Sequence, residues 1–341
     1  MKYICKIKGD LSQLKVNANK MKYLGLSFAV FAILITQSCR ENNKTTKNSE
    51  YLSNLELIRF DSLFAQTKAE DLDGIKRAFP FMFPVEVEDR IWLDKIENDP
   101  LQKELEQEVA KLYDGEITYK NELGRLFYNF EKYFDASAPK VMTVVSKVDY
   151  KNRILYADSL LFIGLDSYLG KDHYFYEGIP VYQRELLDRR YLASDVSAVL
   201  VKSRLPFTTN RQFLYKMIQY GKEVYIKTLL NLEVSTAVNL GYTEESYQWS
   251  KANEKQIWSY FLENDFIYST DKELEKRFLD LSPFSKFGLQ IDLESPSRIG
   301  RFIGYRIVEQ YMDKNKRTSV SELIELDAIA LLEQSNYKPK R

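Results

Sequence analysis

The residues whose chemistry is most useful for catalysis are acidic side chains and one histidine near the middle of the chain. Asp166, Asp172 and His173 lie close together around two glycine turns, and Glu177 follows them. A carboxylate beside an imidazole can act as an acid–base pair in a hydrolase. The same residue types also cap turns and hydrogen-bond within loops. The sequence leaves both interpretations open, a catalytic site and a structural loop, and favours the loop.

Other catalytic motifs are missing from the sequence. His173 is the only histidine among the 341 residues, so neither an HExxH zinc site nor a three-histidine metal site can be built. The glycine spacings contain no G-x-S-x-G elbow, no G-x-x-x-x-G-K-[ST] loop and no G-x-G-x-x-G turn. We therefore expect no metal, no nucleotide and no other cofactor.

Cys39 is the residue with the clearest chemical role, because it closes a segment typical of a bacterial lipoprotein signal peptide. Met21 and a following lysine give a positive start, residues 24–35 are apolar or small, and a serine precedes the cysteine. Only a thiol can receive the diacylglycerol thioether. We expect residues 1–38 to be removed, with Met21 the better initiator, and Cys39 to carry acyl chains such as palmitate. An ordinary signal peptide or an uncleaved anchor is the alternative, although residues 23–39 are short for a membrane span.

The rest of the chain is predicted to be a tether and one domain. Residues 39–50 are polar and lack large apolar side chains, as a linker between lipid and protein should. Residues 51–341 contain no linker-like stretch and no internal repeat, which indicates a single globular domain. Cys5 precedes the cleavage site, so the mature domain has no disulfide. Its charge is mildly acidic without a basic stripe, and we expect no nucleic-acid partner.

The hydrophobic pattern predicts an α+β fold, mostly helical with a small antiparallel sheet. The strands are expected in three short β-rich runs, residues 141–148, 153–157 and 160–165, separated by turn residues. The many Tyr and Phe side chains are expected to fill the core between helices. Helices are predicted at residues 101–112, 121–133, 196–200, 213–230, 254–263, 299–312 and 320–332.

Gly300 and Gly304 lie four residues apart in a predicted water-soluble helix. This spacing predicts close packing of the helix on a neighbour, because small residues let two backbones approach. Ser295, followed by a proline, is the expected N-cap of that helix. Glu294 and Arg298 flank this start signal and are candidates for a structural or partner-binding role.

Seven short blocks cover essentially the whole mature chain. They are KVDY (147–150), LDSYLG with DHYFY (165–176), DVSAVLV (195–201), MIQYGKEVYIK (217–227), IWSYF (257–261), PFSKF (283–287) and ESPSRIGRFIGYRIV (294–308). In this order the blocks resemble the gliding-motility lipoprotein GldB family of Bacteroidetes. The resemblance implies a cell-envelope lipoprotein needed for gliding, in the company of the type IX secretion and motility apparatus, and it implies no established reaction.

The family in turn resembles predicted zinc peptidases, in which an HExxH helix precedes a Glu-Gly helix that supplies the third ligand. The corresponding helices here are residues 195–202 and 217–227, and neither contains a histidine. Tyr220 precedes Gly221 where the peptidases have glutamate. Asp195 alone cannot replace three zinc ligands. The resemblance therefore implies a zincin-like scaffold without the metal site, a pseudo-peptidase rather than an enzyme.

Together these observations predict a lipid-anchored cell-envelope protein required for gliding motility, acting as a non-catalytic interaction or assembly component. Its expected partners are the membrane, through the lipid anchor, and other gliding or secretion envelope proteins. Residues 40–43 lack two consecutive acidic residues that mark surface export, which favours a periplasm-facing position. The alternative is a cryptic envelope hydrolase that uses Asp166, Asp172, His173 and Glu177. That alternative requires these four side chains to converge in a pocket.

Overall fold

A computed structural model describes residues 55–157 and 159–339, which belong to one unit spanning Tyr51–Arg341. The signal peptide, Cys39 and the tether lie outside the described residues. The strands are β1 (Leu57–Ile58), β2 (Lys140–Val144), β3 (Ile154–Ala157) and β4 (Leu160–Gly164). The helices are α2 (Phe60–Ala65), α3 (Leu72–Ala78), α4 (Asp89–Glu97), α5 (Pro100–Tyr113), α6 (Thr118–Phe134), α7 (Val181–Arg184), α8 (Leu192–Lys202), α9 (Phe213–Leu230), α10 (Thr236–Leu240), α11 (Glu244–Ala252), α12 (Glu254–Glu263), α13 (Glu273–Phe278), α14 (Ile299–Lys314), α15 (Val320–Glu325) and α16 (Ala328–Ser335).

The α+β class is confirmed, but the sheet is mixed rather than purely antiparallel. Its strand order is β1-β2-β4-β3. β3 and β4 form the expected antiparallel pair, whereas β4 runs parallel to β2 and β2 runs parallel to β1. The reason is burial. Leu161 and Ile163 of β4 are fully buried, so β4 takes an inner position beside β2, and the half-exposed β3 takes the edge.

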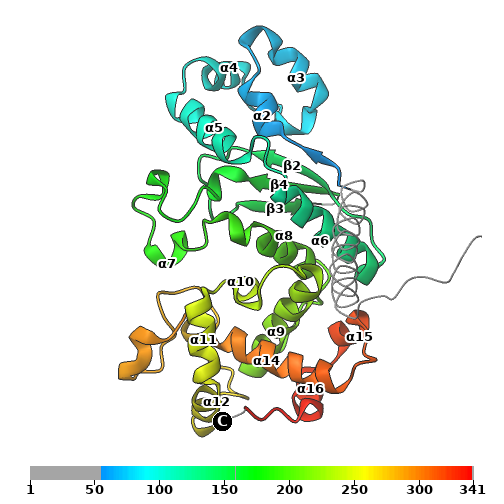
Figure 1. The fold of residues 1–341 in the computed structure, drawn as a ribbon, viewed down its shortest axis with the longest axis vertical. Coiled ribbons are helices and arrows are strands. Elements are labelled where there is room, and N and C mark those ends of the chain that lie inside the picture. The colour runs from blue at the N-terminus through cyan, green and yellow to red at the C-terminus, as the bar shows by residue number, and fades with distance from the viewer. Residues whose placement is uncertain (1–54, 158, 340–341) are drawn as a thin grey trace, which may run out of the picture. The chain divides into compact units, whose positions relative to one another are not determined.

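The sheet separates two hydrophobic clusters, because alternate side chains of each strand point to opposite faces. Val141, Leu161 and Ile163 face the larger cluster, which α6, α8 and the C-terminal helices complete. Met142 and Phe162 face a smaller cluster formed with α2, α3 and α4. Figure 1 shows the N-terminal helices α2 to α5 on one side of the sheet and α6 and α8 on the other.

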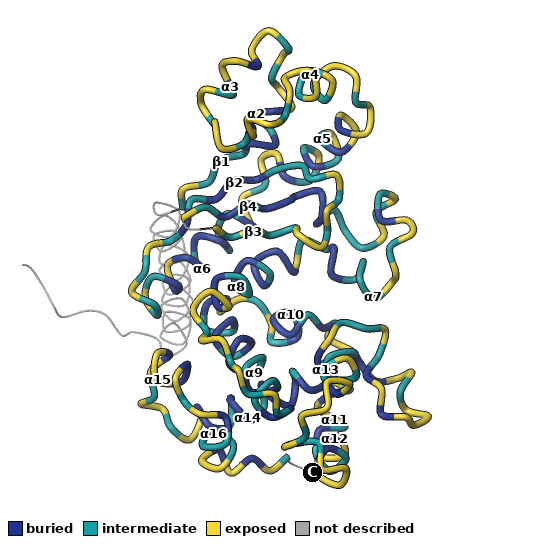
Figure 2. The backbone as a smooth tube through the Cα atoms, turned by 180° about the vertical axis from the view of Figure 1, so that it is seen from behind, coloured by how far each residue is buried: buried dark blue, intermediate teal, exposed yellow. Residues whose placement is uncertain are grey.

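The larger cluster centres on α9 and α14, which pack directly against each other. Both helices carry long buried faces, seen as dark segments of the tube in Figure 2. Aromatic rings fill the space around them, as the sequence predicts. Phe213 of α9, for example, lies edge-on to Phe261 of α12, with ring centroids 5.5 Å apart.

The helices predicted at 213–230 and 254–263 match the structure, whereas α6 and α8 begin three and four residues before their predicted starts. The short helices α2, α3, α4, α7, α10, α11 and α13 were not predicted. Two further differences lie towards the C-terminal end of the chain. The predicted helix 320–332 is two helices, because Asp327 accepts the N–H groups of Ile329 and Ala330 and starts a new one. Ser295 is not the N-cap of α14. Its hydroxyl donates to the carbonyl oxygens of Ser285 and Asp292, and the helix begins after Arg298, whose φ is 61°.

Candidate functional site

Asp166 is a buried structural residue. It is 0% exposed and lies in a short 3-10 turn directly after β4. Its carboxylate accepts the N–H groups of Ser146 (3.0 Å) and Val148 (2.6 Å) and the Ser146 hydroxyl (3.0 Å). Burial raises the pKa of this carboxyl, while these donors lower it. Asp166 therefore fixes the loop that follows β2.

His173 also makes local contacts. Its Nδ1 accepts the N–H of Phe175 (3.3 Å), and its Nε2 lies 3.4 Å from Oε2 of Glu108 on α5. Its ring stacks on Tyr174, with centroids 4.5 Å apart. Asp172 and Glu177 are exposed, whereas Asp166 is enclosed. The structure thus does not gather the four predicted residues around one cavity, and the hydrolase alternative stays a prediction without a shared pocket behind it.

Asp195, near the start of α8, forms an ion pair. Its Oδ2 accepts Nε of Arg153 (2.8 Å) and the hydroxyl of Tyr168 (2.8 Å). Both charged side chains are mostly covered, with 19% and 24% of their surfaces exposed. These contacts connect α8 to the edge strand β3, which follows Arg153, and Oδ2 of Asp195 accepts both hydrogen bonds.

Helix α9 makes a close contact with α14 at Gly221. A Cβ on Gly221 would lie 2.3 Å from the carbonyl oxygen of Gly304, and a Cβ on Gly304 would lie 2.0 Å from that of Met217. At Gly300, a Cβ would meet Leu279 at 2.8 Å. This is the close helix packing that the glycine spacing predicts. Tyr220 points elsewhere, with Arg301 over its ring at 3.7 Å.

Helix α9 also carries two buried lysines. Nζ of Lys227 donates to the carbonyl oxygen of Asn239 (2.6 Å), and Nζ of Lys222 donates to those of Ile324 (2.8 Å) and Leu326 (2.6 Å). Burial lowers the pKa of each lysine to about 8, although nearby carboxylates oppose the shift. These contacts join α9 to the loops around it.

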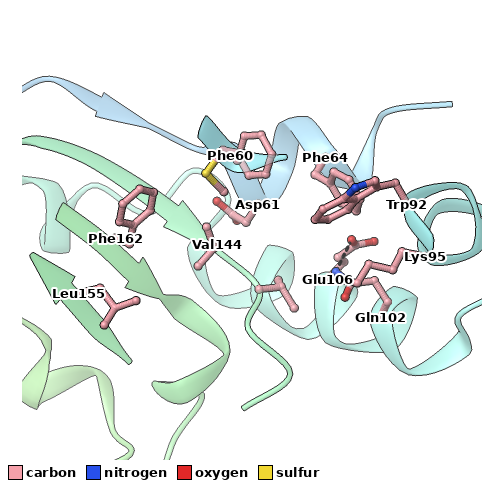
Figure 3. A pocket seen from close by; sticks show the side chains of 12 residues that line it. Phe60, Asp61, Phe64, Trp92, Lys95, Gln102, Glu106, Val144, Leu155 and Phe162 are labelled. Atoms are coloured by element: carbon pink, nitrogen blue, oxygen red, sulfur yellow. Dashed lines mark hydrogen bonds between the residues drawn. The ribbon is translucent and has the colours of Figure 1, made fainter. Parts of the chain in front are cut away.

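A pocket with a volume of about 260 Å³ lies between the N-terminal helices and the sheet. Its apolar wall comes from both layers, as Figure 3 shows. Phe60 and Phe64 project from α2, Trp92 from α4, and Leu155 and Phe162 from β3 and β4. The segments that form it are distant in the sequence. Sequence reasoning missed this pocket, whose only signal was the aromatic spacing within α2.

The other end of this pocket is polar and incompletely hydrogen-bonded. Gln102 is 3% exposed and donates through Nε2 to Glu106 (2.8 Å), but its Oε1 has no partner among the described residues. Nε1 of Trp92 is also buried without a partner in that part of the chain. Lys95 lies over the Trp92 ring at 5.0 Å. These side chains gather at the helical end of the pocket in Figure 3.

Burial shifts the protonation of the two charged residues at this end towards their neutral forms. The pKa of Glu106 is raised by burial, with Asp61 and Asp99 adding repulsion. The pKa of Lys95 is lowered by burial and then by Lys147. An apolar cavity with unpaired polar groups at one end is the usual composition of a binding site. It is smaller than a drug-sized site of about 300–1,000 Å³, so it fits one large side chain or a small ligand.

Neither a metal-binding cluster nor a membrane-spanning helix is found in the described residues. Within residues 55–157 and 159–339, no three His, Cys, Asp or Glu side chains are grouped so that they could hold a metal ion. In the same part of the chain, no helix combines the length and apolar character needed to cross a membrane.

Searches of the curated proteins and of the solved structures found no match. The family model of gliding motility protein GldB matches residues 41–339, which is nearly all of the sequence after Cys39. The chain therefore belongs to the GldB family of gliding motility proteins.

Proposed function

We propose that this protein is a lipid-anchored component of the cell envelope that supports gliding by binding partners rather than by catalysis. The observation that carries the proposal is the family match over residues 41–339, which ties the chain to gliding motility and to a lipoprotein family. The partners are other envelope proteins of the motility and type IX secretion apparatus.

The anchor is Cys39, which lies outside the described residues. Its two acyl chains meet the usual need for two signals in stable membrane attachment. The tether that follows lets the domain work at a distance from the lipid, on the periplasmic side. The membrane is then a partner through the lipid and not through a spanning helix.

A non-catalytic role is supported by what occupies the two helices that resemble the peptidase ligand helices. On α8, Asp195 neutralises Arg153 and accepts the Tyr168 hydroxyl. On α9, Gly221 touches the backbone of α14, so a larger side chain would force the helices apart. These positions stabilise the fold, and a scaffold of this kind can be retained for binding.

The pocket between α2, α4, α5 and the sheet is the site that we assign to an envelope partner. It offers an apolar wall and polar atoms of Trp92 and Gln102 that have no hydrogen-bond partner within residues 55–157 and 159–339. A side chain with an apolar body and a polar tip would bury its body against the wall and pair with these atoms. A partner protein that inserts one such side chain gains specificity from the polar end.

The anchor is tested in a strain lacking the gene, complemented with the wild type or with Cys39→Ala. We expect Cys39→Ala to release the domain into the soluble fraction in folded form and to fail to restore gliding. An unchanged membrane fraction would contradict lipidation at Cys39. Normal gliding by a soluble Cys39→Ala protein would contradict the need for an anchor.

The pocket is tested in the same strain with Leu155→Trp, which places a large ring at its mouth. Leu155 is 52% exposed, so the variant should fold. The control is Leu262→Trp on α12, at a position 49% exposed and away from this pocket. We expect only Leu155→Trp to impair gliding. Normal gliding with Leu155→Trp present at wild-type level would show that the pocket is not used.

A further inference from the structure

Arg298 is held in an unusual position at the start of α14. It adopts left-handed backbone geometry with φ of 61°, which is uncommon for a residue other than glycine. Its Nη2 donates to the carbonyl oxygen of Gly241 (2.8 Å). A Cβ on Gly241 would lie 2.6 Å from that nitrogen, so only glycine leaves room for the guanidinium. The local structure thus fixes this cation in one place.

Arg298 is one of the residues that line a pocket of about 600 Å³, which is separate from the one described above. Prolines and aliphatic side chains form much of the wall, and hydroxyl groups are interspersed with them. A volume of this size falls in the range of about 300–1,000 Å³ typical of ligand sites. The apolar residues are Pro180, Val181, Leu186, Leu281, Pro283 and Pro296, and the hydroxyl residues are Thr243, Ser246, Ser282 and Ser297.

Two polar groups in this pocket have hydrogen-bonding capacity that is not used. Nε of Arg298 is buried and has no partner among the described residues, and the same holds for the hydroxyl of Tyr242. Tyr242 is only 4% exposed. Ser250 opposes the rise that burial causes in the pKa of Tyr242, and the Ser250 hydroxyl donates its own hydrogen to the carbonyl oxygen of Ser246 (2.8 Å). Unpaired buried donors are costly unless a ligand satisfies them.

The charges around the pocket favour an anion. None of the ion pairs in the described part of the chain includes Arg298. Burial lowers its pKa to about 10, and Arg301 contributes to that shift, with Asp195 and the tyrosines 191 and 242 opposing it. The positive end of the α14 dipole adds to the field.

A carboxylate in the lining of the pocket limits how much negative charge the ligand can carry. Glu185 lines the same pocket. Its Oε1 pairs with Lys171 (2.7 Å), whereas its Oε2 lies 3.8 Å from Arg190 and accepts no hydrogen bond from the described residues. A ligand with two negative charges would be attracted by Arg298 but repelled by Glu185. A ligand with one carboxylate needs only the Arg298 guanidinium as its counter-charge. The apolar wall indicates that the rest of the ligand is hydrophobic, and the wall hydroxyls can pair with amide groups.

We propose that this pocket binds the carboxyl terminus of a peptide whose last residue is apolar. The carboxylate accepts Nε–H of Arg298 and the hydroxyl of Tyr242, and the last side chain packs against the proline-rich wall. Capture of a terminal carboxylate is a recurring mode of peptide recognition. This proposal rests on the geometry of the pocket and does not require that the protein act in gliding.

The test uses the full-length protein in detergent and a library of N-acetylated tripeptides with apolar last residues. Binding is measured by affinity selection with mass spectrometry, followed by titration of the best peptide. We expect the free acid to bind at least about 10-fold more tightly than its carboxamide. Tyr242→Phe should weaken binding of the free acid by about 5-fold without lowering thermal stability, because the lost hydroxyl has no partner among the described residues. Arg298→Gln should weaken it further.

Tyr119→Phe is the matched control, because it removes another buried hydroxyl without a partner in the described part of the chain, at a position outside this pocket. It should leave the affinity unchanged. Equal binding of acid and carboxamide, or no selected peptide, would overturn the proposal. So would tighter binding of inorganic phosphate or of decanoate than of every peptide, which would identify a different anion as the ligand.

Discussion

Replacing Gly304 with alanine should destabilise the domain, even though alanine is the better helix former by about 1 kcal/mol. The new Cβ would lie 2.0 Å from the carbonyl oxygen of Met217, a backbone atom that cannot rotate away. Helices α9 and α14 would have to separate. Such overpacking costs about 3 kcal/mol at the upper end of its usual range. The expected net loss is therefore about 2 kcal/mol, or a Tm lower by about 4–8 °C.

The assay is thermal and urea unfolding of the full-length protein, with two comparison variants. Gly74 of α3 is exposed and has nothing within 4 Å of the position that a Cβ would take, so Gly74→Ala should raise stability by up to about 1 kcal/mol. Gly300→Ala should fall between the two, because the atom it meets at 2.8 Å belongs to the movable side chain of Leu279. The reasoning is refuted if Gly304→Ala is as stable as the wild type while Gly74→Ala is stabilised.

Two further predictions concern buried charge. Lys222 and Lys227 have folded-state pKa values lowered to about 8, so the unfolded chain binds more protons above that pH. The free energy of unfolding should therefore rise by about 1–2 kcal/mol per lysine between about pH 8 and 9.5. Urea titrations across this range should show a smaller rise in Lys227→Met, and a flat profile in the wild type would contradict the shift. Asp195→Asn should cost about 1–3 kcal/mol, because Arg153 keeps its charge without a carboxylate. Wild-type stability by urea unfolding would argue against this pair.

Long periodic segments were predictable from the sequence because local pattern and tertiary contact agree there. The bounds of α9 and α12 are those of the predicted helices 213–230 and 254–263. The glycine pair on α14 also pointed to its packing role. In each case one helix face is buried along its whole length, so the apolar period is unbroken.

The errors lie where distant residues decide the local structure. The parallel pairing of β4 with β2 depends on which strand is buried on both faces, and three short β-rich runs do not encode that order. Ser295 looks like an N-cap, yet Ser285 and Asp292 capture its hydroxyl. Ser295 therefore stabilises the segment before α14 instead of capping the helix.

The two candidate pockets could not be predicted from the sequence, because their lining residues are far apart along the chain. The apolar wall near Phe60 needs Phe162, and the pocket at Arg298 needs Tyr242. Each pair is far apart along the chain and is brought together only by the packed fold. The acidic cluster around His173 shows the converse, because residues that are neighbours in the sequence differ in burial and face different partners.

The central claim is that the protein supports gliding without catalysis, and one measurement tests it directly. Single-cell gliding is recorded in a strain lacking the gene and complemented with the triple variant Asp172→Asn, His173→Gln, Glu177→Gln. Asp166 is kept because it fixes a buried loop. We expect gliding at wild-type speed. Loss of gliding, with the triple variant folded and membrane-bound at the wild-type level, would contradict the claim and favour a hydrolase.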